Sequence, residues 1–314
     1  MIAEGLGRLF GHGRPRVLAL VDLVQDIDIL LPVLIALRDD GRLALRILVS
    51  RWLERESPRT GGLLQAHGLK FSYERRQRIV DGSAPRLDQI AAVLSAAEST
   101  HPAHRAGHAL AERAGARGIR TYTLQHGLES VGLTGVGATQ GRFASEAVFC
   151  WFPENATPPE LSAETRAKLA HVGRPAPPGG WTPQAPPQFD LAVYENLHWD
   201  RYGEAERDAF VAGLRAVAQS CPDLRIMLRP HPAGGWGETL RHEFAHFPGL
   251  TISGGAEARS ALTSTAQSPA LAARVITTPS TVALDAALAG RPVALAVNGG
   301  SIYTPLQVLE CPGD

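Results

Sequence analysis

Lysine, cysteine and methionine are scarce in this 314-residue chain. It has two methionines and three cysteines, and its only lysines are Lys70 and Lys168. The cysteines, Cys150, Cys221 and Cys311, are odd in number and far apart, which excludes a disulfide framework and a cysteine-based zinc cluster. Arginine therefore supplies nearly all of the positive charge. Its planar side chain suits paired hydrogen bonds to anions, although a GC-rich gene would give the same bias.

Long hydrophobic runs are also missing. No uninterrupted apolar stretch approaches the roughly 20 residues that a bilayer span needs, and the segment Met1–Arg16 lacks the apolar core of a secretion signal. Because 31 basic residues balance 31 acidic ones, we expect no nucleic acid partner. With 44% hydrophobic residues the chain can fill a sizeable core, so we expect a soluble, cytoplasmic protein.

Three common catalytic motifs are absent. No G-x-G-x-x-G follows the first expected strand, which argues against a conventional dinucleotide oxidoreductase. The chain has no Walker phosphate loop and no G-x-S-x-G elbow, so neither an NTPase nor an α/β-hydrolase is indicated.

Strand-like and helix-like segments alternate along the chain, which predicts an α/β fold with parallel sheets and helices on both faces. The expected strands are 16–21, 43–49, 69–73, 93–97, 120–124 and 147–151, the last of the first half, and then 190–194, 225–228, 274–277 and 292–297. The expected helices are 27–38, 61–67, 102–116 with Thr100 as N-cap, 203–219, 238–247 and 280–289. The charged segment 74–85 is expected to be a loop.

A segment rich in proline and glycine, RPAPPGGWTPQAPPQ, ends at Gln188 and leaves no room for a regular element. We therefore expect two Rossmann-like domains, 1–175 and 189–314, joined by a linker at 176–188. A ligand is expected between them, at the carboxyl ends of the strands.

The most informative stretch runs through Thr278, Ser280 and Thr281 to Asp285, where an expected strand ends in hydroxyl residues and a helix begins at once. Unpaired amides at a helix N-terminus and neighbouring hydroxyls can bind a phosphate. Asp285, one turn further along, could reach the hydroxyls of a sugar. The alternative is that Ser280 only caps the helix and Asp285 faces solvent.

Two other expected strands end in histidine motifs. Arg229-Pro230-His231-Pro232 holds an imidazole between two prolines beside an arginine, an arrangement that suits phosphate binding or protonation of a leaving group. Gln125-His126-Gly127 ends a strand in the first half, where a buried structural histidine is at least as plausible. His101, His104 and His108 share one helix face, and the last two have the i, i+4 spacing of zinc ligands. No third ligand is evident, and a solvated or arginine-adjacent histidine face is the simpler expectation.

The order of these three strand-end motifs resembles the GT-B glycosyltransferases and glycerophosphotransferases of bacterial surface polysaccharide synthesis. The likeness is to the CDP-glycerol glycerophosphotransferase type and to capsule polysaccharide transferases that use CMP-activated sugars, and it extends from Ala91 to Pro305. It implies two Rossmann-like domains facing a cleft, with the first on the acceptor side and the second binding the donor nucleotide. The chain departs from the family pattern at Pro279 and stops soon after Leu306.

The resemblance also implies roles for particular residues. His231 and the Ser280–Thr281 turn would bind the donor phosphates, Asp285 would lie near the nucleotide sugar, and His126 would face the cleft. No cofactor or metal is expected, because Arg229, His231 and the helix terminus would offset the phosphate charge. The donor would be CMP- or CDP-linked, and the acceptor a glycan or a lipid-linked glycan. A lipid-linked acceptor would bring the enzyme to the inner face of the membrane as a peripheral protein.

Such a transferase needs a base to take the proton of the acceptor hydroxyl. Glu98 is the first choice, because it follows an expected strand and should point into the same crevice as His126. Asp22 and Asp26 are alternatives, and each of the three acids could instead cap a helix or pair with an arginine. Glu195, at the end of the first strand of the second domain, could contact donor or acceptor. Two other functions remain open: a UDP-sugar epimerase or hydrolase of the same fold, and a non-catalytic protein that only binds a nucleotide sugar.

Overall fold

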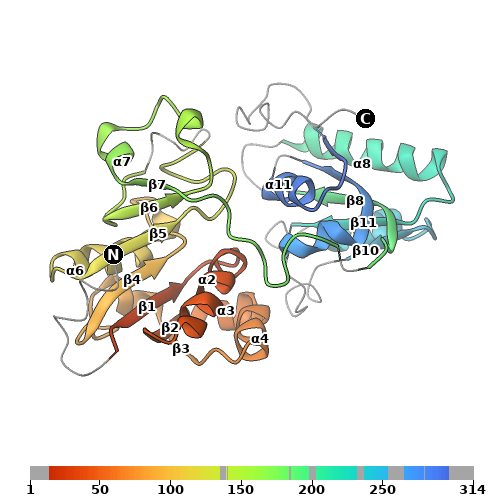
Figure 1. The fold of residues 1–314 in the computed structure, drawn as a ribbon. Helices are drawn as coiled ribbons and strands as arrows, with labels where there is room; N and C mark the ends of the chain where they lie inside the picture. The colour runs from red at the N-terminus through yellow and green to blue at the C-terminus, as the bar shows by residue number, and fades with distance from the viewer. Residues whose placement is uncertain are drawn as a thin grey trace. The chain divides into compact units, whose positions relative to one another are not determined.

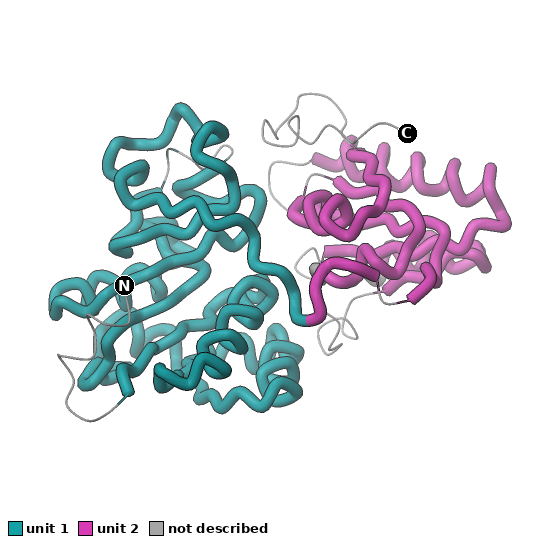
Figure 2. The backbone as a smooth tube through the Cα atoms, viewed as in Figure 1, with its two compact units in different colours: residues 1–178 teal, residues 179–314 magenta. Residues whose placement is uncertain are grey.

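The computed structural model describes residues 14–134, 139, 141–183, 185–197, 203–231, 237–253, 265–278 and 280–296. Contacts divide the chain into two compact units, Met1–Pro178 and Gly179–Asp314 (Figure 2). The division falls inside the segment predicted as a linker. Pro279 and the residues around Leu306 lie outside the described residues.

Unit 1 contains a seven-stranded parallel sheet with the strand order β3-β2-β1-β4-β5-β6-β7 (Figure 1). Its strands are β1 (Arg16–Val21), β2 (Ala44–Ser50), β3 (Phe71–Glu74), β4 (Ile90–Ser95), β5 (Arg120–Leu124), β6 (Ala147–Cys150) and β7 (Leu169–His171). Its α-helices are α2 (Asp26–Asp40), α3 (Arg51–Glu56), α4 (Pro58–Ala66), α5 (Arg76–Val80), α6 (Arg105–Gly115) and α7 (Ala163–Ala167), with 3₁₀ turns at Pro102–His104 and Glu154–Ala156.

The sequence of β1, RVLALV, explains its central position in the sheet. Alternate side chains of a strand point to opposite faces, so Val17 and Ala19 join the core formed with α2, α3 and α4, whereas Leu18 joins the core formed with α5 and α6. A strand that is buried on both faces needs a continuous apolar run, and that is what the sequence contains.

Unit 2 repeats this plan with a five-stranded parallel sheet in the order β10-β9-β8-β11-β12. Leu191 and Val193 pack with α8 and α9 on one face, and Ala192 packs with α11 on the other. The strands are β8 (Phe189–Glu195), β9 (Ile226–Pro230), β10 (Leu250–Ile252), β11 (Ala272–Thr277) and β12 (Val293–Leu295). The helices are α8 (Glu204–Ser220), α9 (Gly237–Phe244), α11 (Thr281–Leu288) and a 3₁₀ segment, Thr265–Leu271.

The strand orders place one crevice in each unit. β1 lies between β2 and β4, and β8 lies between β9 and β11, so the chain crosses over in opposite directions on the two sides of each central strand. The loops that leave the carboxyl ends of the two diverging strands therefore separate, and ligands of open α/β sheets bind at such points.

The predicted α/β class, the parallel sheets and the helices on both faces are confirmed. Several details were wrong, including the following. The segment 74–85, predicted as a loop, contains α5, because Ile79 is fully buried and anchors a short helix in a charged stretch. β7 follows the strand predicted to be the last of the first half, and β10 was missed; each has three residues and so gives too short a pattern to detect. His101, rather than Thr100, caps the turn before α6 by accepting the Ala103 N–H.

None of the helices in the described part of the chain is both long enough and apolar enough to span a membrane.

Candidate functional site

In unit 2, two hydrogen bonds join the loops that leave β8 and β11 at the base of the crevice between these strands. The Thr278 N–H donates to the carbonyl of Tyr194 at 3.0 Å, and the Asn196 N–H donates to Thr278 Oγ1 at 2.7 Å. Thr278 is 1% exposed, so its hydroxyl holds the two loops together. Its predicted place in donor binding is therefore at the floor of the crevice.

The start of α11 forms a small cluster of hydroxyl groups above this floor. Ser280 is the N-cap, and its Oγ accepts the Val282 N–H at 3.2 Å. The Thr277 hydroxyl donates to the Thr278 carbonyl at 2.7 Å and lies 3.0 Å from Ser280 Oγ, so Ser280 supplies the proton between the two hydroxyls. The first-turn amides and the helix dipole make this end of α11 suited to an anion.

The carboxylate of Glu195 connects β8 to the histidine loop after β9. One oxygen accepts the His231 N–H at 3.2 Å, and the other accepts the Leu197 N–H. Glu195 is 2% exposed, so we assign it a structural role in place of the donor or acceptor contact that the sequence suggested. It fixes the backbone of His231, whose side chain is partly exposed beside Arg229.

Asp285 is buried within unit 2, which excludes the alternative that it faces solvent. Burial raises the pKa of Tyr194 to about 12, and the Tyr194 hydroxyl donates to Ser268 Oγ at 3.0 Å. The negative charge of Asp285 adds to this rise in pKa, and the positive charge of Arg229 opposes it. Arg229 and Asp285 therefore both lie within electrostatic range of the Tyr194 hydroxyl, while Thr281 lies at the partly exposed start of α11.

In unit 1, the Gln-His-Gly motif follows β5 and is held by its glutamine. The Gln125 side chain donates to the Gly127 carbonyl at 2.8 Å and accepts the Trp151 N–H at 2.9 Å, which ties the end of β5 to the end of β6. Sequence analysis assigned no role to Gln125. Its position at the end of an apolar strand could have indicated this role, because a buried side-chain amide needs hydrogen-bond partners for both its NH₂ group and its carbonyl oxygen.

His126 is partly exposed and lies at one end of a row of three imidazoles. Its ring meets the ring of His104 at 88° with centroids 5.1 Å apart, and His104 lies 5.3 Å from His101. Burial lowers the pKa of His104 to about 3 and that of His126 to about 4, so both are neutral at pH 7. His104 Nδ1 lies 2.7 Å from Ser99 Oγ, and His126 Nδ1 lies 3.5 Å from Ser130 Oγ.

The solvated or arginine-adjacent face expected for His101, His104 and His108 is wrong for His104, whereas His101 and His108 are partly exposed. His104 is 4% exposed and lies against His126, and His108 binds the buried carboxylate of Glu98 at 2.6 Å. Among the described residues, no group of three or more histidines, cysteines or acids is placed to hold a metal ion.

The first-choice base, Glu98, is enclosed by partners. Its carboxylate accepts the Ala144 N–H at 2.9 Å and the Ser145 N–H at 3.1 Å in addition to its bond with His108. The side chain has no exposed surface, so the structure gives no support to the expected opening toward a crevice shared with His126. These contacts assign Glu98 to holding the chain that leads into β6.

The second candidate base, Asp22, lies just after β1 and is 2% exposed. Its Oδ1 accepts the Arg76 Nε–H at 2.7 Å, and the Arg76 guanidinium also lies over the Trp52 ring at 4.1 Å. Burial raises the pKa of Asp22, and Arg76 opposes the rise. The Asp22 N–H donates to Asp26 Oδ2 at 2.9 Å, so Asp26 holds this turn from the first residue of α2.

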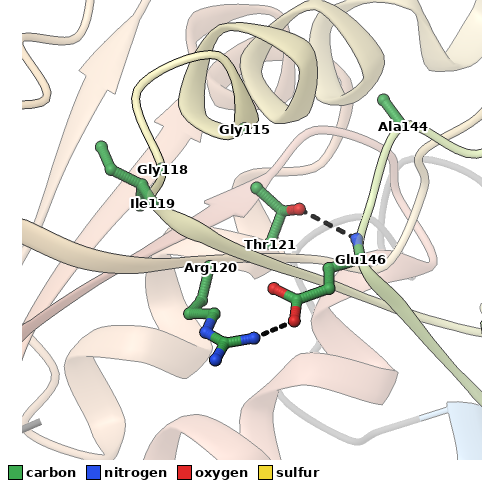
Figure 3. A pocket seen from close by; sticks show the side chains of 7 residues that line it. All are labelled: Gly115, Gly118, Ile119, Arg120, Thr121, Ala144 and Glu146. Atoms are coloured by element: carbon green, nitrogen blue, oxygen red, sulfur yellow. Dashed lines mark hydrogen bonds and ion pairs between the residues drawn. The ribbon is translucent and has the colours of Figure 1, made fainter.

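A cavity of about 330 Å³ opens at the opposite end of β5 (Figure 3). Arg120 and Glu146 form an ion pair across it, and the Glu146 N–H donates to Thr121 Oγ1 at 3.0 Å. None of the predicted site residues lines it, and its charged groups already neutralise each other. We do not assign the site to this cavity.

Comparison with known proteins begins with two negative results. No protein-family model matches the chain, and no curated protein matches it in sequence. Similarity is found with solved structures.

The chain is similar to UDP-GlcNAc 2-epimerase from Neisseria meningitidis bound to UDP-GlcNAc, with a TM-score of 0.61, 11% identity, and coverage of 89% of this chain and 82% of the epimerase. UDP-GlcNAc 2-epimerase from Methanocaldococcus jannaschii, in complex with UDP-GlcNAc and UDP, gives a TM-score of 0.57 at 11% identity over 88% of this chain and 83% of that one. A glycosyltransferase from Rickettsia africae gives 0.56 at 10% identity over 95% and 82%.

The chain has the GT-B fold. At this level of identity the likeness establishes the fold alone. Within this GT-B fold, the structure brings Thr278, Ser280 and His231 to the carboxyl edge of the unit 2 sheet. Glu195 binds the His231 amide, and Thr278 accepts the amide of Asn196, the next residue after Glu195. On the unit 1 sheet Asp22, Glu98 and His126 follow three neighbouring strands, β1, β4 and β5, but their side chains have separate sets of partners.

Proposed function

We propose that this protein is a transferase that moves a sugar or polyol phosphate from a nucleotide-activated donor to a glycan or lipid-linked acceptor. The observation that carries the proposal is the hydroxyl cluster at the start of α11, where Ser280 caps the helix at 3.2 Å and lies 3.0 Å from Thr277 Oγ1. A donor phosphate would receive hydrogen bonds from the first-turn amides and from Thr281. The helix dipole would favour its negative charge.

The remaining donor contacts would come from the loop after β9. The Glu195 carboxylate holds the His231 backbone, and the imidazole of His231 would bind the phosphates and protonate the leaving group. Arg229 would supply positive charge close to the crevice. Asp285, because it is buried, would act on the donor through the electrostatic field of the site and through its neighbours. A cytidine nucleotide is favoured by the family resemblance of the motifs, and no metal is needed to offset the phosphate charge.

On the acceptor side, we propose that His126 is the base that accepts the proton of the attacking hydroxyl. With a pKa of about 4 the His126 ring is neutral, donates a hydrogen bond to the Ala96 backbone, and would accept one from the acceptor at its other nitrogen. Asp22 is the second candidate, and Glu98 is not included because its oxygens are occupied. With a lipid-linked acceptor, the enzyme would work in the cytoplasm at the inner face of the membrane.

A nucleotide-sugar epimerase is the second candidate, because two of the similar structures are UDP-GlcNAc 2-epimerases. The two functions differ in their need for an acceptor. An epimerase converts its nucleotide sugar without one, whereas the proposed transferase releases nucleotide in proportion to the acceptor supplied.

The test is a thermal-shift panel of CMP, CDP, UDP, GDP and ADP at millimolar concentration. We expect a cytidine nucleotide to raise the Tm, because a ligand that binds only the native state stabilises it. His231→Ala and Ser280→Ala should abolish the shift. The matched controls are His242→Ala, an exposed histidine of unit 2, and Ser162→Ala, which removes an N-cap from α7 in unit 1. If no nucleotide shifts the wild-type Tm, the proposal fails; if only UDP does, the epimerase is favoured.

A further inference from the structure

We propose that Ser99 and His104 are positioning residues that hold the His126 ring in the orientation its role at the acceptor requires. This inference rests on the proposed function and deepens it. Its basis is a chain of three contacts: Ser99 Oγ to His104 Nδ1 at 2.7 Å, the His104 ring perpendicular to the His126 ring at 5.1 Å, and His126 Nδ1 to Ser130 Oγ at 3.5 Å. Ser99 and His104 have no role in the proposed function as described so far.

The first contact fixes the rotation of the His104 ring. Ser99 has no exposed surface and His104 is 4% exposed, so water does not compete for their hydrogen bond. The Ser99 hydroxyl also accepts the His101 N–H at 3.3 Å, which leaves its proton for His104 Nδ1. The ring of His104 is therefore held at both Cβ and Nδ1, and it presents a fixed surface to His126.

The turn that carries Ser99 is itself held on both sides. Glu98 accepts two amides from the 144–145 segment, and the Thr100 N–H donates to the Arg142 carbonyl at 3.0 Å. On the side of α6, the backbone of Gly107 lies so close that a Cβ there would be 2.3 Å from the Ala97 carbonyl oxygen. Ser99 thus belongs to a rigid support, the kind that positions a reacting group to within a fraction of an ångström.

The charge state of the three imidazoles, His101, His104 and His126, also favours a positioning role for His104. Beyond burial, the His126 pKa is raised by a hydrogen bond to the Ala96 backbone and lowered by His101, and the His104 pKa is lowered by His126 and His101. Because His104 is neutral, it places no positive charge beside His126. His126 can then accept a proton without repulsion from its neighbour, and a charged side chain at position 104 would oppose this.

The experiment compares Ser99→Ala, His104→Gln and His104→Ala with wild type in the full-length chain. Two quantities are measured: the titration of His126 by NMR of histidine-labelled protein, assigned with His126→Gln, and the kcat and donor KM of transfer. The control is His67→Ala, a histidine at the end of α4 in unit 1. Thermal melts establish that each variant is folded.

We expect His104→Ala to move the His126 titration toward the ordinary histidine pKa and to lower kcat by at least about tenfold with an unchanged donor KM, since small misplacements of a reacting group are costly. Ser99→Ala should have a smaller effect of the same kind, and His104→Gln, which keeps a hydrogen-bonding group, should recover part of kcat. Unchanged His126 titration in His104→Ala overturns the inference, even if the protein proves not to be a transferase. A changed titration with no transfer in wild type overturns the proposed function instead.

Discussion

The carboxylates of Glu98 and Glu195 are both buried, and both accept hydrogen bonds from backbone amides. Glu98 binds Ala144 and Ser145, and Glu195 binds Leu197 and His231. Each acid follows a strand and holds a loop that is distant in sequence. Glu98, the first-choice base, fixes the backbone that leads into β6, and Glu195, predicted to contact donor or acceptor, fixes the backbone of the His231 motif.

The first prediction is that Glu98→Gln destabilises the protein by about 1–3 kcal/mol, because an amide nitrogen replaces an oxygen that accepts a buried N–H. Urea unfolding at pH 7 measures the change. The control is Glu112→Gln, which removes an exposed acid 3.6 Å from the same histidine, His108. Equal effects for the two variants would contradict the structural role of Glu98.

The second prediction concerns Asp26, whose pKa is raised to about 7, chiefly by burial. The folded state therefore binds a proton that the unfolded state releases, so its contribution to stability is full below about pH 4 and is lost as the pH rises to about 7. Asp26→Asn has no carboxyl group to ionise, so its stability does not fall in this way as the pH rises. Its carbonyl oxygen can still accept both N–H groups, which are donated to one oxygen of Asp26 by Asp22 and Leu23.

We expect Asp26→Asn to be more stable than wild type by about 1–3 kcal/mol at pH 8, with a much smaller difference at pH 4. Chemical denaturation across this pH range is the measurement. Asp88→Asn, at an exposed position of the same unit, should show no such pH dependence. A less stable Asp26→Asn at pH 8 would mean that the carboxylate is held in its charged form.

At the scale of elements, the close approach of α6 to the turn after β4 depends on one glycine. A Cβ at Gly107 would lie 2.3 Å from the carbonyl oxygen of Ala97, whereas a Cβ at Gly115, in the same helix, would meet nothing within 4 Å. The third prediction is that Gly107→Ala destabilises the protein by about 1–3 kcal/mol, while Gly115→Ala is neutral or stabilises it by up to about 1 kcal/mol. Thermal melts of the two variants provide the check, and similar Tm values would contradict this packing.

Elements with a clear apolar pattern could be predicted from sequence, and contacts between distant segments could not. β1 and β8 were found because each is a continuous apolar run, and α8 because its pattern is long. The three motifs do lie at strand ends. The partners of Glu98 are 46 and 47 positions away, and the Glu195–His231 pair spans 36, so only the fold could reveal them.

At the scale of the whole molecule, two units with separate cores carry the candidate groups. The fourth prediction is that a donor nucleotide, at about 100 times its Kd, stabilises the protein by about 2.7 kcal/mol and slows hydrogen exchange mainly in unit 2. Protection should centre on the end of β8, the His231 loop and the first turn of α11. Hydrogen-exchange mass spectrometry with and without nucleotide measures this. Protection centred on the loops after β1 and β5 would place the nucleotide on the other unit.

The all-parallel pairing of both sheets has a consequence for how the chain folds. β1 can pair with β4 only after residue 90 has been synthesised, because Arg16 pairs with Ile90. In the same way, β8 can pair with β11 only after residue 272, because Phe189 pairs with Ala272. Sheets dominated by such distant pairings fold slowly, because loop-closure entropy is lost before the contacts form. During synthesis, unit 1 can complete its sheet, whose last strand β7 ends at His171, before unit 2 has been made. Refolding from denaturant should therefore show two kinetic phases, one for each sheet.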